Sequence, residues 1–167
     1  MADLDGTRLT TLDGRETTLA EWTGQAKLIV NVASRCGLAP QYEKLEWLQR
    51  EYGDRGFTVI GFPSNQFLQE YRSNAKIAEY CATTWGVTFP MMDRIRVNGR
   101  NRHLLYQELV QTPDADGKAG QVQWNFEKFL IAPDGSVTRF RPRVEPDAPA
   151  VVAAIEAALP EGIGDNA

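Results

Sequence analysis

The chain has few of the residues from which metal sites and disulfide frameworks are built. Its 167 residues include only two cysteines, Cys36 and Cys81, and one histidine, His103. Two cysteines 45 positions apart make no disulfide framework, and one histidine does not complete the usual zinc ligand set with them. The sequence also has no nucleotide or flavin motif. We therefore expect neither a metal nor an organic cofactor.

Excess positive charge and long apolar runs are missing too. The formal net charge is −4, which disfavours binding to nucleic acid or to an anionic membrane. No apolar run approaches the roughly 20 residues of a membrane span, and Met1–Gly6 lacks the basic and apolar segments of a secretory signal. We expect a cytoplasmic location without stable membrane association. In a reducing compartment, a cysteine pair is more typical of transient redox chemistry than of a structural disulfide.

Length and composition indicate a single globular domain. A chain of this length with 43% hydrophobic and 24% charged residues is typical of one domain. No repeat, low-complexity block or linker divides it. We therefore expect one domain over residues 1–167, with a flexible tail over residues 160–167, because Pro160 ends the last helical pattern.

The order of the predicted elements is typical of an α/β fold with a mixed sheet. The pattern predicts a hairpin over Leu9–Leu19 around Asp13-Gly14, strands over Lys27–Ala33 and Phe57–Phe62, helices over Pro40–Tyr52, Ser73–Thr84 and Asn101–Val110, a second hairpin of Glu127–Ala132 and Ser136–Arg141, and a helix over Asp147–Leu159. The strand–helix–strand order implies a parallel pair with a right-handed crossover. Function gathers at the carboxyl ends of such strands, where Cys36 and Ser64–Gln66 lie.

Cys36 directly follows an apolar strand and precedes a helix. We expect a thiol in this position to lie near the surface, with helix N–H groups and the neighbouring Arg35 favouring the thiolate, which is the nucleophile. The alternative is that Cys36 is a small buried hydrophobic residue, because most free cysteines in proteins are of this kind. The placement favours a reactive cysteine.

Three segments resemble the signature segments of the glutathione peroxidase family. They are Asn31–Gly37 (NVASRCG), Gly61–Phe67 (GFPSNQF) and Trp124–Phe129 (WNFEKF), in the family's order. The similarity extends from about Leu9 to Leu159. It implies a thioredoxin-like fold, with a mixed central sheet flanked by helices and an N-terminal β-hairpin. It also implies a peroxidase that reduces hydroperoxides to water or alcohol through a sulfenic acid on its cysteine.

The resemblance also implies a set of catalytic residues. The family surrounds its peroxidatic residue with Gln, Trp and Asn, and the motifs carry these roles onto Cys36, Gln69, Trp124 and Asn125. The Gln69 segment departs from the family pattern, because one residue instead of two separates it from Phe67, and Tyr71-Arg72 replaces the usual Pro-Gly. Gln66 and Asn65 are therefore alternatives. From pattern alone, Trp124 also fits a core aromatic residue and Asn125 a turn residue.

Cys81 bears on the source of electrons. One branch of the family uses glutathione directly, and another forms an internal disulfide that thioredoxin opens. Cys81 lies near the position of that branch's resolving cysteine, so we predict a Cys36–Cys81 disulfide recycled by thioredoxin. Glutathione recycling and an inert, buried Cys81 are the alternatives. A disulfide needs Cα atoms within about 7 Å, so the predicted helix around Cys81 must unwind locally, which the weakly helical Ala82–Thr84 allows.

Three further expectations remain. The loop over Thr112–Gly120 is short where tetrameric relatives carry an insertion, which implies a monomer. The order Cys36, His103, Asn125 is that of papain-like hydrolases, although His103 at a helix start also fits a solvated or capping residue. A thioredoxin-fold peroxide sensor, which is oxidised without turnover, is the non-enzymatic alternative.

Overall fold

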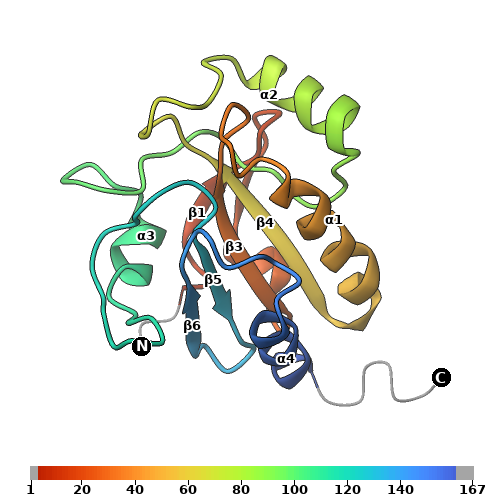
Figure 1. Cartoon of the computed structure of the whole chain (residues 1–167), viewed down its shortest axis with the longest axis vertical. Helices are drawn as coiled ribbons and strands as arrows, with labels where there is room; N and C mark the ends of the chain where they lie inside the picture. Colours follow the sequence, from red (N-terminus) through yellow and green to blue (C-terminus); the bar gives the residue numbers. More distant parts are fainter. Residues whose placement is uncertain (1–3, 161–167) are drawn as a thin grey trace.

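The structure is a computed structural model that describes residues 4–160 as two sheets surrounded by helices (Figure 1). In chain order the elements are β1 (Arg8–Thr10), β2 (Glu16–Thr18), the 3₁₀-helix η1 (Leu19–Trp22), β3 (Ala26–Val32), α1 (Gln41–Tyr52), the 3₁₀-turn η2 (Gly53–Arg55), β4 (Phe57–Pro63), α2 (Asn74–Tyr80), the π-helical turn η3 (Cys81–Trp85), α3 (Leu104–Leu109), β5 (Lys128–Ile131), β6 (Val137–Phe140) and α4 (Pro149–Ala158). Of the tail expected over residues 160–167, all but Pro160 lies outside the described residues.

The main sheet has four strands in the order β4-β3-β5-β6. β3 pairs in parallel with β4 and antiparallel with β5, and β5 pairs antiparallel with β6. The predicted parallel pair and the predicted second hairpin are therefore confirmed. The predicted N-terminal hairpin is confirmed as well, and β1 and β2 form a two-stranded sheet of their own. Its turn includes Gly14 at φ +93°, a conformation that glycine adopts without strain.

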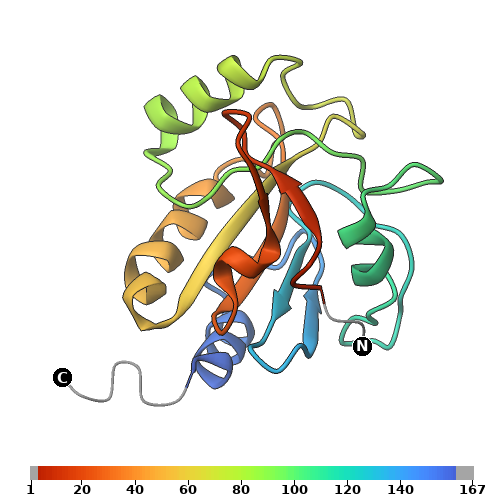
Figure 2. The ribbon, with the colours of Figure 1, turned by 180° about the vertical axis from the view of Figure 1, so that it is seen from behind.

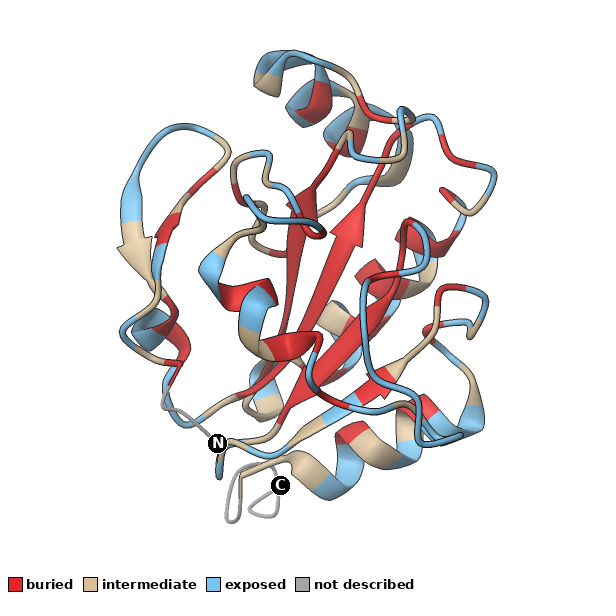
Figure 3. Cartoon of the chain, turned by 90° about the vertical axis from the view of Figure 1, so that its left-hand side faces the viewer, coloured by how far each residue is buried: buried red, intermediate tan, exposed pale blue. Residues whose placement is uncertain are grey.

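The apolar run of β3 is explained by burial on both faces of the sheet (Figure 3). Leu28 and Val30 pack into a cluster with α1 and α4, whereas Ile29 packs into a second cluster with the hairpin and α3. Successive side chains of a strand point to opposite faces, so a strand covered twice is apolar throughout. Figures 1 and 2 show these two layers of cover from opposite sides.

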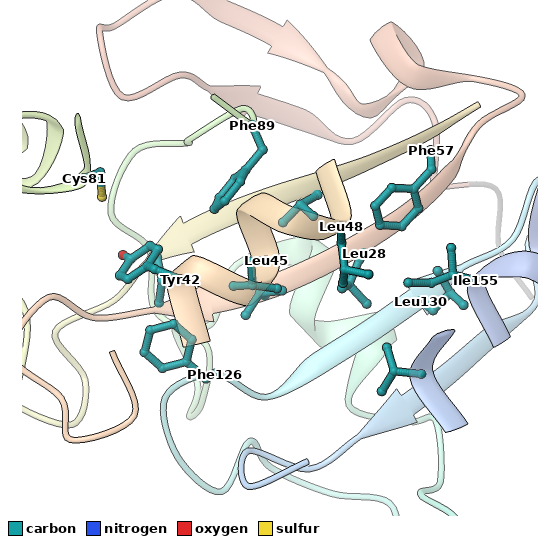
Figure 4. Packing of buried hydrophobic residues seen from close by; sticks show 14 of the residues in the cluster. Leu28, Tyr42, Leu45, Leu48, Phe57, Cys81, Phe89, Phe126, Leu130 and Ile155 are labelled. Atoms are coloured by element: carbon teal, nitrogen blue, oxygen red, sulfur yellow. The ribbon is translucent and has the colours of Figure 1, made fainter. Parts of the chain in front are cut away.

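Helix α1 is fixed to the sheet by residues at helical spacing. Tyr42, Leu45 and Leu48 are fully buried, and Figure 4 shows Leu48 near Leu28 and Phe57, and Tyr42 near Phe126. Burying each such side chain is worth about 1.5–3 kcal/mol relative to leaving it exposed. The end of β3 and the start of α1 are therefore both anchored, and the loop between them carries Cys36.

Helix α1 lacks only Pro40 of its predicted range, whereas the other three helices are shorter than predicted by several residues. α3 begins at Leu104, because the His103 side chain acts as its N-cap and accepts the Leu105 N–H at 3.1 Å. α4 begins at Pro149, a residue suited to the first turn. α2 is capped by Ser73 as expected but ends at Tyr80, where the π-helical turn η3 replaces the predicted α-helix. None of the helices within residues 4–160 is long and apolar enough to span a membrane.

Candidate active site

Cys36 lies in the loop between β3 and α1, and it is more buried than the sequence suggested. Only 6% of the residue is exposed, and it belongs to the cluster between the sheet and α1. The expectation of a thiol near the surface is wrong in this respect, because the chain turns at once after β3 and Ala39 N–H bonds back to the Cys36 carbonyl. The sulfur nevertheless borders a cavity.

The donor nearest in sequence to the sulfur comes from this turn and not from a helix. The Leu38 N–H points at Cys36 Sγ with an N···S distance of 3.3 Å, whereas α1 begins only at Gln41. The turn, and not helix α1, therefore supplies the N–H group that faces the sulfur.

The cavity beside Cys36 has a volume of about 600 Å³ and is built from four separate segments. Its lining residues are Cys36, Gly37, Leu38, Gln69, Gln123, Trp124, Arg141, Pro142 and Arg143. Three of the four predicted catalytic residues therefore share one cavity. The fourth segment, which follows β6, was not anticipated from the sequence.

Gln69 reaches this cavity although its loop is shortened. The Gln69 carbonyl accepts the Arg35 N–H at 2.8 Å, and Glu70 Oε1 accepts the Ser34 N–H at 3.1 Å, so the loop is docked directly on the Cys36 loop. Within this loop Leu68 adopts a left-handed backbone conformation, with φ +62°, and is 85% exposed.

The side-chain amides of the two alternatives, Gln66 and Asn65, form hydrogen bonds away from the cavity. Gln66 accepts the N–H groups of Val97 and Asn98 at 2.8 and 2.9 Å and donates to the Asn98 carbonyl. Asn65 Oδ1 accepts the Glu70 N–H at 3.0 Å and so shapes the loop. Among the three candidate amides, Gln69 is the one that lines the cavity.

Trp124 lines the cavity and is not a core residue. It is 38% exposed, and its ring lies 4.9 Å from that of Phe67. Its carbonyl accepts from Asn31 Nδ2 at 3.1 Å, while Asn31 also accepts the N–H groups of Phe126 and Glu127. Asn31 thereby fixes the turn that carries Trp124. The sequence signal for this role is the amide of Asn31 near the end of a mostly apolar strand, and the structure buries it fully.

Asn125 lies behind the cavity wall instead of in it. It is fully buried, and its Nδ2 donates to Gln69 Oε1 at 3.2 Å. It is also a turn residue, because it precedes β5 in the segment that Asn31 holds. Asn125 therefore touches the site through Gln69, whose Nε2 is left as the amide's remaining donor.

Cys81 is the first residue of η3 and is 3% exposed. Burial raises the pKa of its thiol to about 11, against a smaller opposite effect of the Tyr42 hydroxyl. Figure 4 shows Cys81 and Tyr42 at the same end of the core cluster. Cys81 does not line the 600 Å³ cavity, but it belongs to the same buried cluster as Cys36, and both thiols are free.

His103 lies at a different cavity, together with Arg8, Asp93 and Arg94. It caps α3 and does not line the cavity beside Cys36. The capping role that the sequence allowed is confirmed, and the papain-like grouping of Cys36, His103 and Asn125 is wrong. Among residues 4–160, no group of three or more His, Cys, Asp or Glu side chains is arranged to hold a metal ion.

Comparison with known proteins identifies the family. The family model for glutathione peroxidase matches residues 6–110, which is more than half of the chain. This chain belongs to the glutathione peroxidase family. The match includes Cys36 and Gln69 and ends before Trp124 and Asn125, which the fold brings to the same place.

Individual relatives agree with this assignment. The chain is 48% identical over 169 residues to the thioredoxin/glutathione peroxidase BtuE of Escherichia coli (strain K12). This match covers 89% of this chain and 92% of the relative. It is 44% identical over 155 residues to the hydroperoxy fatty acid reductase Gpx2 of Synechocystis sp. (strain ATCC 27184 / PCC 6803 / Kazusa), covering 92% and 97%.

A solved structure of the family confirms the fold. The crystal structure of Trgpx in its apo form superposes with a TM-score of 0.73 at 35% sequence identity, and the match covers 95% of this chain and 96% of that chain. The thioredoxin-like fold, the N-terminal hairpin and the family inferred from the sequence are confirmed. As a member of this family, the chain is a peroxidase.

Proposed function

We propose that this chain is a thiol peroxidase that reduces hydrogen peroxide and organic or lipid hydroperoxides through Cys36. One observation carries the proposal: Cys36, Gln69 and Trp124 line a single cavity, and Asn125 is hydrogen-bonded to Gln69 behind it. This arrangement sets a sulfur beside neutral N–H donors. Such donors stabilise both a thiolate and a developing oxyanion.

The reaction begins when the Cys36 thiolate attacks one peroxide oxygen. A sulfur–oxygen bond forms, the oxygen–oxygen bond breaks, and the far oxygen leaves as hydroxide or alkoxide, which gains a proton to become water or alcohol. The sulfur is oxidised to a sulfenic acid, and the peroxide is reduced by the same two electrons. In this scheme the indole N–H of Trp124 and the amide of Gln69 donate to the oxygens. Neither is an acid near neutral pH, so the proton comes through water or from the thiol.

The surroundings of the cavity support activity on bulky hydroperoxides. Leu38 and Trp124 both contribute apolar surface to its wall, and the ring of Phe67 lies 4.9 Å from that of Trp124. Apolar surface of this kind binds hydrocarbon chains. One relative is named a hydroperoxy fatty acid reductase, which agrees with lipid hydroperoxides as substrates.

Recycling is proposed to pass through Cys81. Its thiol loses a proton and attacks the Cys36 sulfenic acid, so that a disulfide forms and the hydroxyl leaves as water. The dithiol of thioredoxin then reduces this disulfide by exchange. The name thioredoxin/glutathione peroxidase of one relative supports such a reductant. Because Cys81 is buried and outside the cavity, η3 must move before the bond forms.

A coupled peroxidase assay tests this proposal. Purified protein is given hydrogen peroxide and, separately, thioredoxin with its reductase or glutathione with its reductase. We expect turnover with thioredoxin and loss of at least about 10³-fold in Cys36→Ser, because the nucleophile is removed. Turnover with glutathione alone would contradict the Cys81 route. One round of Cys36 oxidation without turnover in either system would identify a peroxide sensor instead.

Two further measurements address the covalent intermediate and the assembly. After stoichiometric peroxide, mass spectrometry is expected to find a Cys36–Cys81 disulfide, and a stable sulfenic or sulfinic acid on Cys36 would argue against it. Light scattering after gel filtration is expected to give a monomer. A tetramer would contradict the inference made from the short Thr112–Gly120 loop.

A further inference from the structure

A buried lysine stands at the back of the cavity wall. Lys128 is the first residue of β5 and has no exposed surface. Its Nζ donates to the carbonyl of Phe126 and, at 3.1 Å, to that of Pro142. Phe126 belongs to the turn that carries Trp124, and Pro142 itself lines the cavity. One side chain therefore joins two of the four segments that build the site.

The turn held by Lys128 is strained. Phe126 has φ +66°, a left-handed conformation that costs a non-glycine residue roughly 1 kcal/mol or more. Its N–H is held by the Asn31 carbonyl at 2.6 Å, and its own carbonyl is held by Lys128. A strained residue persists where its surroundings fix it on both sides. Loss of the Lys128 contact would release one of those two sides.

The second carbonyl extends the connection to helix α1. Pro142 O accepts from Gln41 Nε2 at 2.8 Å as well as from Lys128. Gln41 is the first residue of α1, directly after the Cys36 loop. The ammonium of Lys128 thus stands where the turn before β5, the segment after β6 and the start of α1 meet.

We propose that Lys128, as an ammonium ion, is a positioning residue that holds the Trp124–Phe126 turn and the Arg141–Arg143 segment in place around Cys36 for peroxide reduction. The inference rests on the function proposed above and names what keeps that cavity in its reactive shape. Charged donors make stronger hydrogen bonds to carbonyls than neutral donors do. Protonated Lys128 therefore holds the walls more firmly than neutral Lys128.

The charges around Lys128 make this hold sensitive to pH. Burial lowers the pKa of Lys128 to about 7, while the carboxylates of Glu145 and Glu127 act in the opposite direction. Both carboxylates are already paired: Glu127 with Arg139 and Arg141, and Glu145 with Lys44 of α1. Within residues 4–160, the hydrogen-bond acceptors of Lys128 Nζ are the two backbone carbonyls. Its charge is therefore lost as the pH rises above about 7.

The test is a single-turnover measurement that does not depend on recycling. Oxidation of Cys36 by hydrogen peroxide is followed by stopped flow between about pH 6 and 9 in wild type and in Lys128→Met. We expect the variant to be about 10- to 100-fold slower at pH 6, since a small displacement of a site costs rates of this order. The ratio of the two rates should fall towards one near pH 9, where wild-type Lys128 is neutral. A merely structural loss would give a ratio independent of pH.

Lys27→Met is the matched control. Lys27 is also a buried strand lysine whose Nζ donates to a carbonyl, that of Gln25 at 3.1 Å. It pairs with Ile131 at the far end of β5, away from the cavity. We expect its rates to stay within about twofold of wild type at every pH. A constant ratio for Lys128→Met, or a loss of less than about threefold at pH 6, would overturn the proposal.

If Lys128→Met does not fold, the proposal is tested by a second variant, Lys128→Arg, and by the pH profile of the wild type. Lys128→Arg keeps its charge at high pH, so it should lack the alkaline decline. In wild type, the rate per Cys36 thiolate should decline with the midpoint at which Lys128 titrates by carbon-13 NMR. A flat profile would overturn the inference. Failure of wild-type Cys36 to react with peroxide at all would instead reject the proposed function.

Discussion

At the scale of single residues, the hydrogen bond between Asn125 and Gln69 predicts that the two act as one unit. Asn125 donates to Gln69 Oε1 at 3.2 Å and does not itself line the cavity. Asn125→Ala should therefore slow Cys36 oxidation by about 10²-fold, because Gln69 loses the partner that orients its amide. Gln69→Ala should cost a similar factor.

The double variant decides whether the two amides are coupled. Residues that act as a unit are not additive, so Asn125→Ala/Gln69→Ala should be little slower than the slower single variant. Single-turnover rates of the four proteins complete the cycle. Losses that multiply would show two independent donors, and a near-normal rate in Asn125→Ala would remove that residue from the mechanism.

The site residues are also the part of the molecule that was predicted least completely from the sequence. The motifs pointed to Cys36 and Trp124, and these two do share a cavity. The depth of Cys36 and the choice of Gln69 over Gln66 depend on loops packed across the sheet edge, which no local pattern encodes. Lys128 was part of a recognised motif, but only the positions of the Phe126 and Pro142 carbonyls gave it a role.

At the scale of elements, the π-helical turn η3 carries Cys81, for which we propose a task different from that of Cys36. Cys81 is the first residue of η3, which follows α2 and precedes Gly86. π-Helical turns often occur at functional sites. We expect Cys81→Ser to leave single-turnover oxidation of Cys36 within about twofold of wild type, because Cys81 does not line the cavity. The sulfenic acid should then persist and react with dimedone, while multiple turnover with thioredoxin stops. Unchanged turnover would make Cys81 an inert core residue.

Strands and hairpins were predicted well where a continuous apolar run or a pair of turn residues is enough to define them. The doubly buried β3 and β4 follow from continuous apolar runs, and both hairpins follow from their Asp-Gly turns. Helix ends were less well predicted. The start of α3 depends on the side-chain cap of His103, and the end of α2 depends on a change of hydrogen-bond pattern at Cys81 that propensities do not describe.

At the scale of the whole molecule, a buried ion pair secures the long α3–β5 connection. Arg139 Nη2 lies 2.5 Å from Glu127 Oε2, and both side chains are fully buried. The Arg139 guanidinium also donates to four backbone carbonyls of that connection, those of Val110, Thr112, Gly120 and Gln121. Arg139→Met should lower the free energy of unfolding by about 3–5 kcal/mol, because buried acceptors and a carboxylate lose their donor. Urea denaturation measures this change.

An exposed pair provides the control for that measurement. Arg15 and Glu21 also form an ion pair, but their side chains are 57% and 36% exposed. Arg15→Met should therefore cost less than about 1 kcal/mol. Equal losses in the two variants would mean that burial does not set the strength of the Arg139 network. Loss of activity without loss of stability in Arg139→Met would contradict a structural role.

The division of the core by the central strand has a consequence for observing the enzyme at work. Both thiols belong to the layer that contains α1 and α4, and neither contributes to the layer beneath the hairpin and α3. In the recycling route proposed above, electron transfer is therefore expected to stay within one half of the protein, on one side of β3. A reporter fluorophore attached to η3 should respond to each catalytic cycle, whereas the same fluorophore on α3 should remain silent and serve as the internal reference.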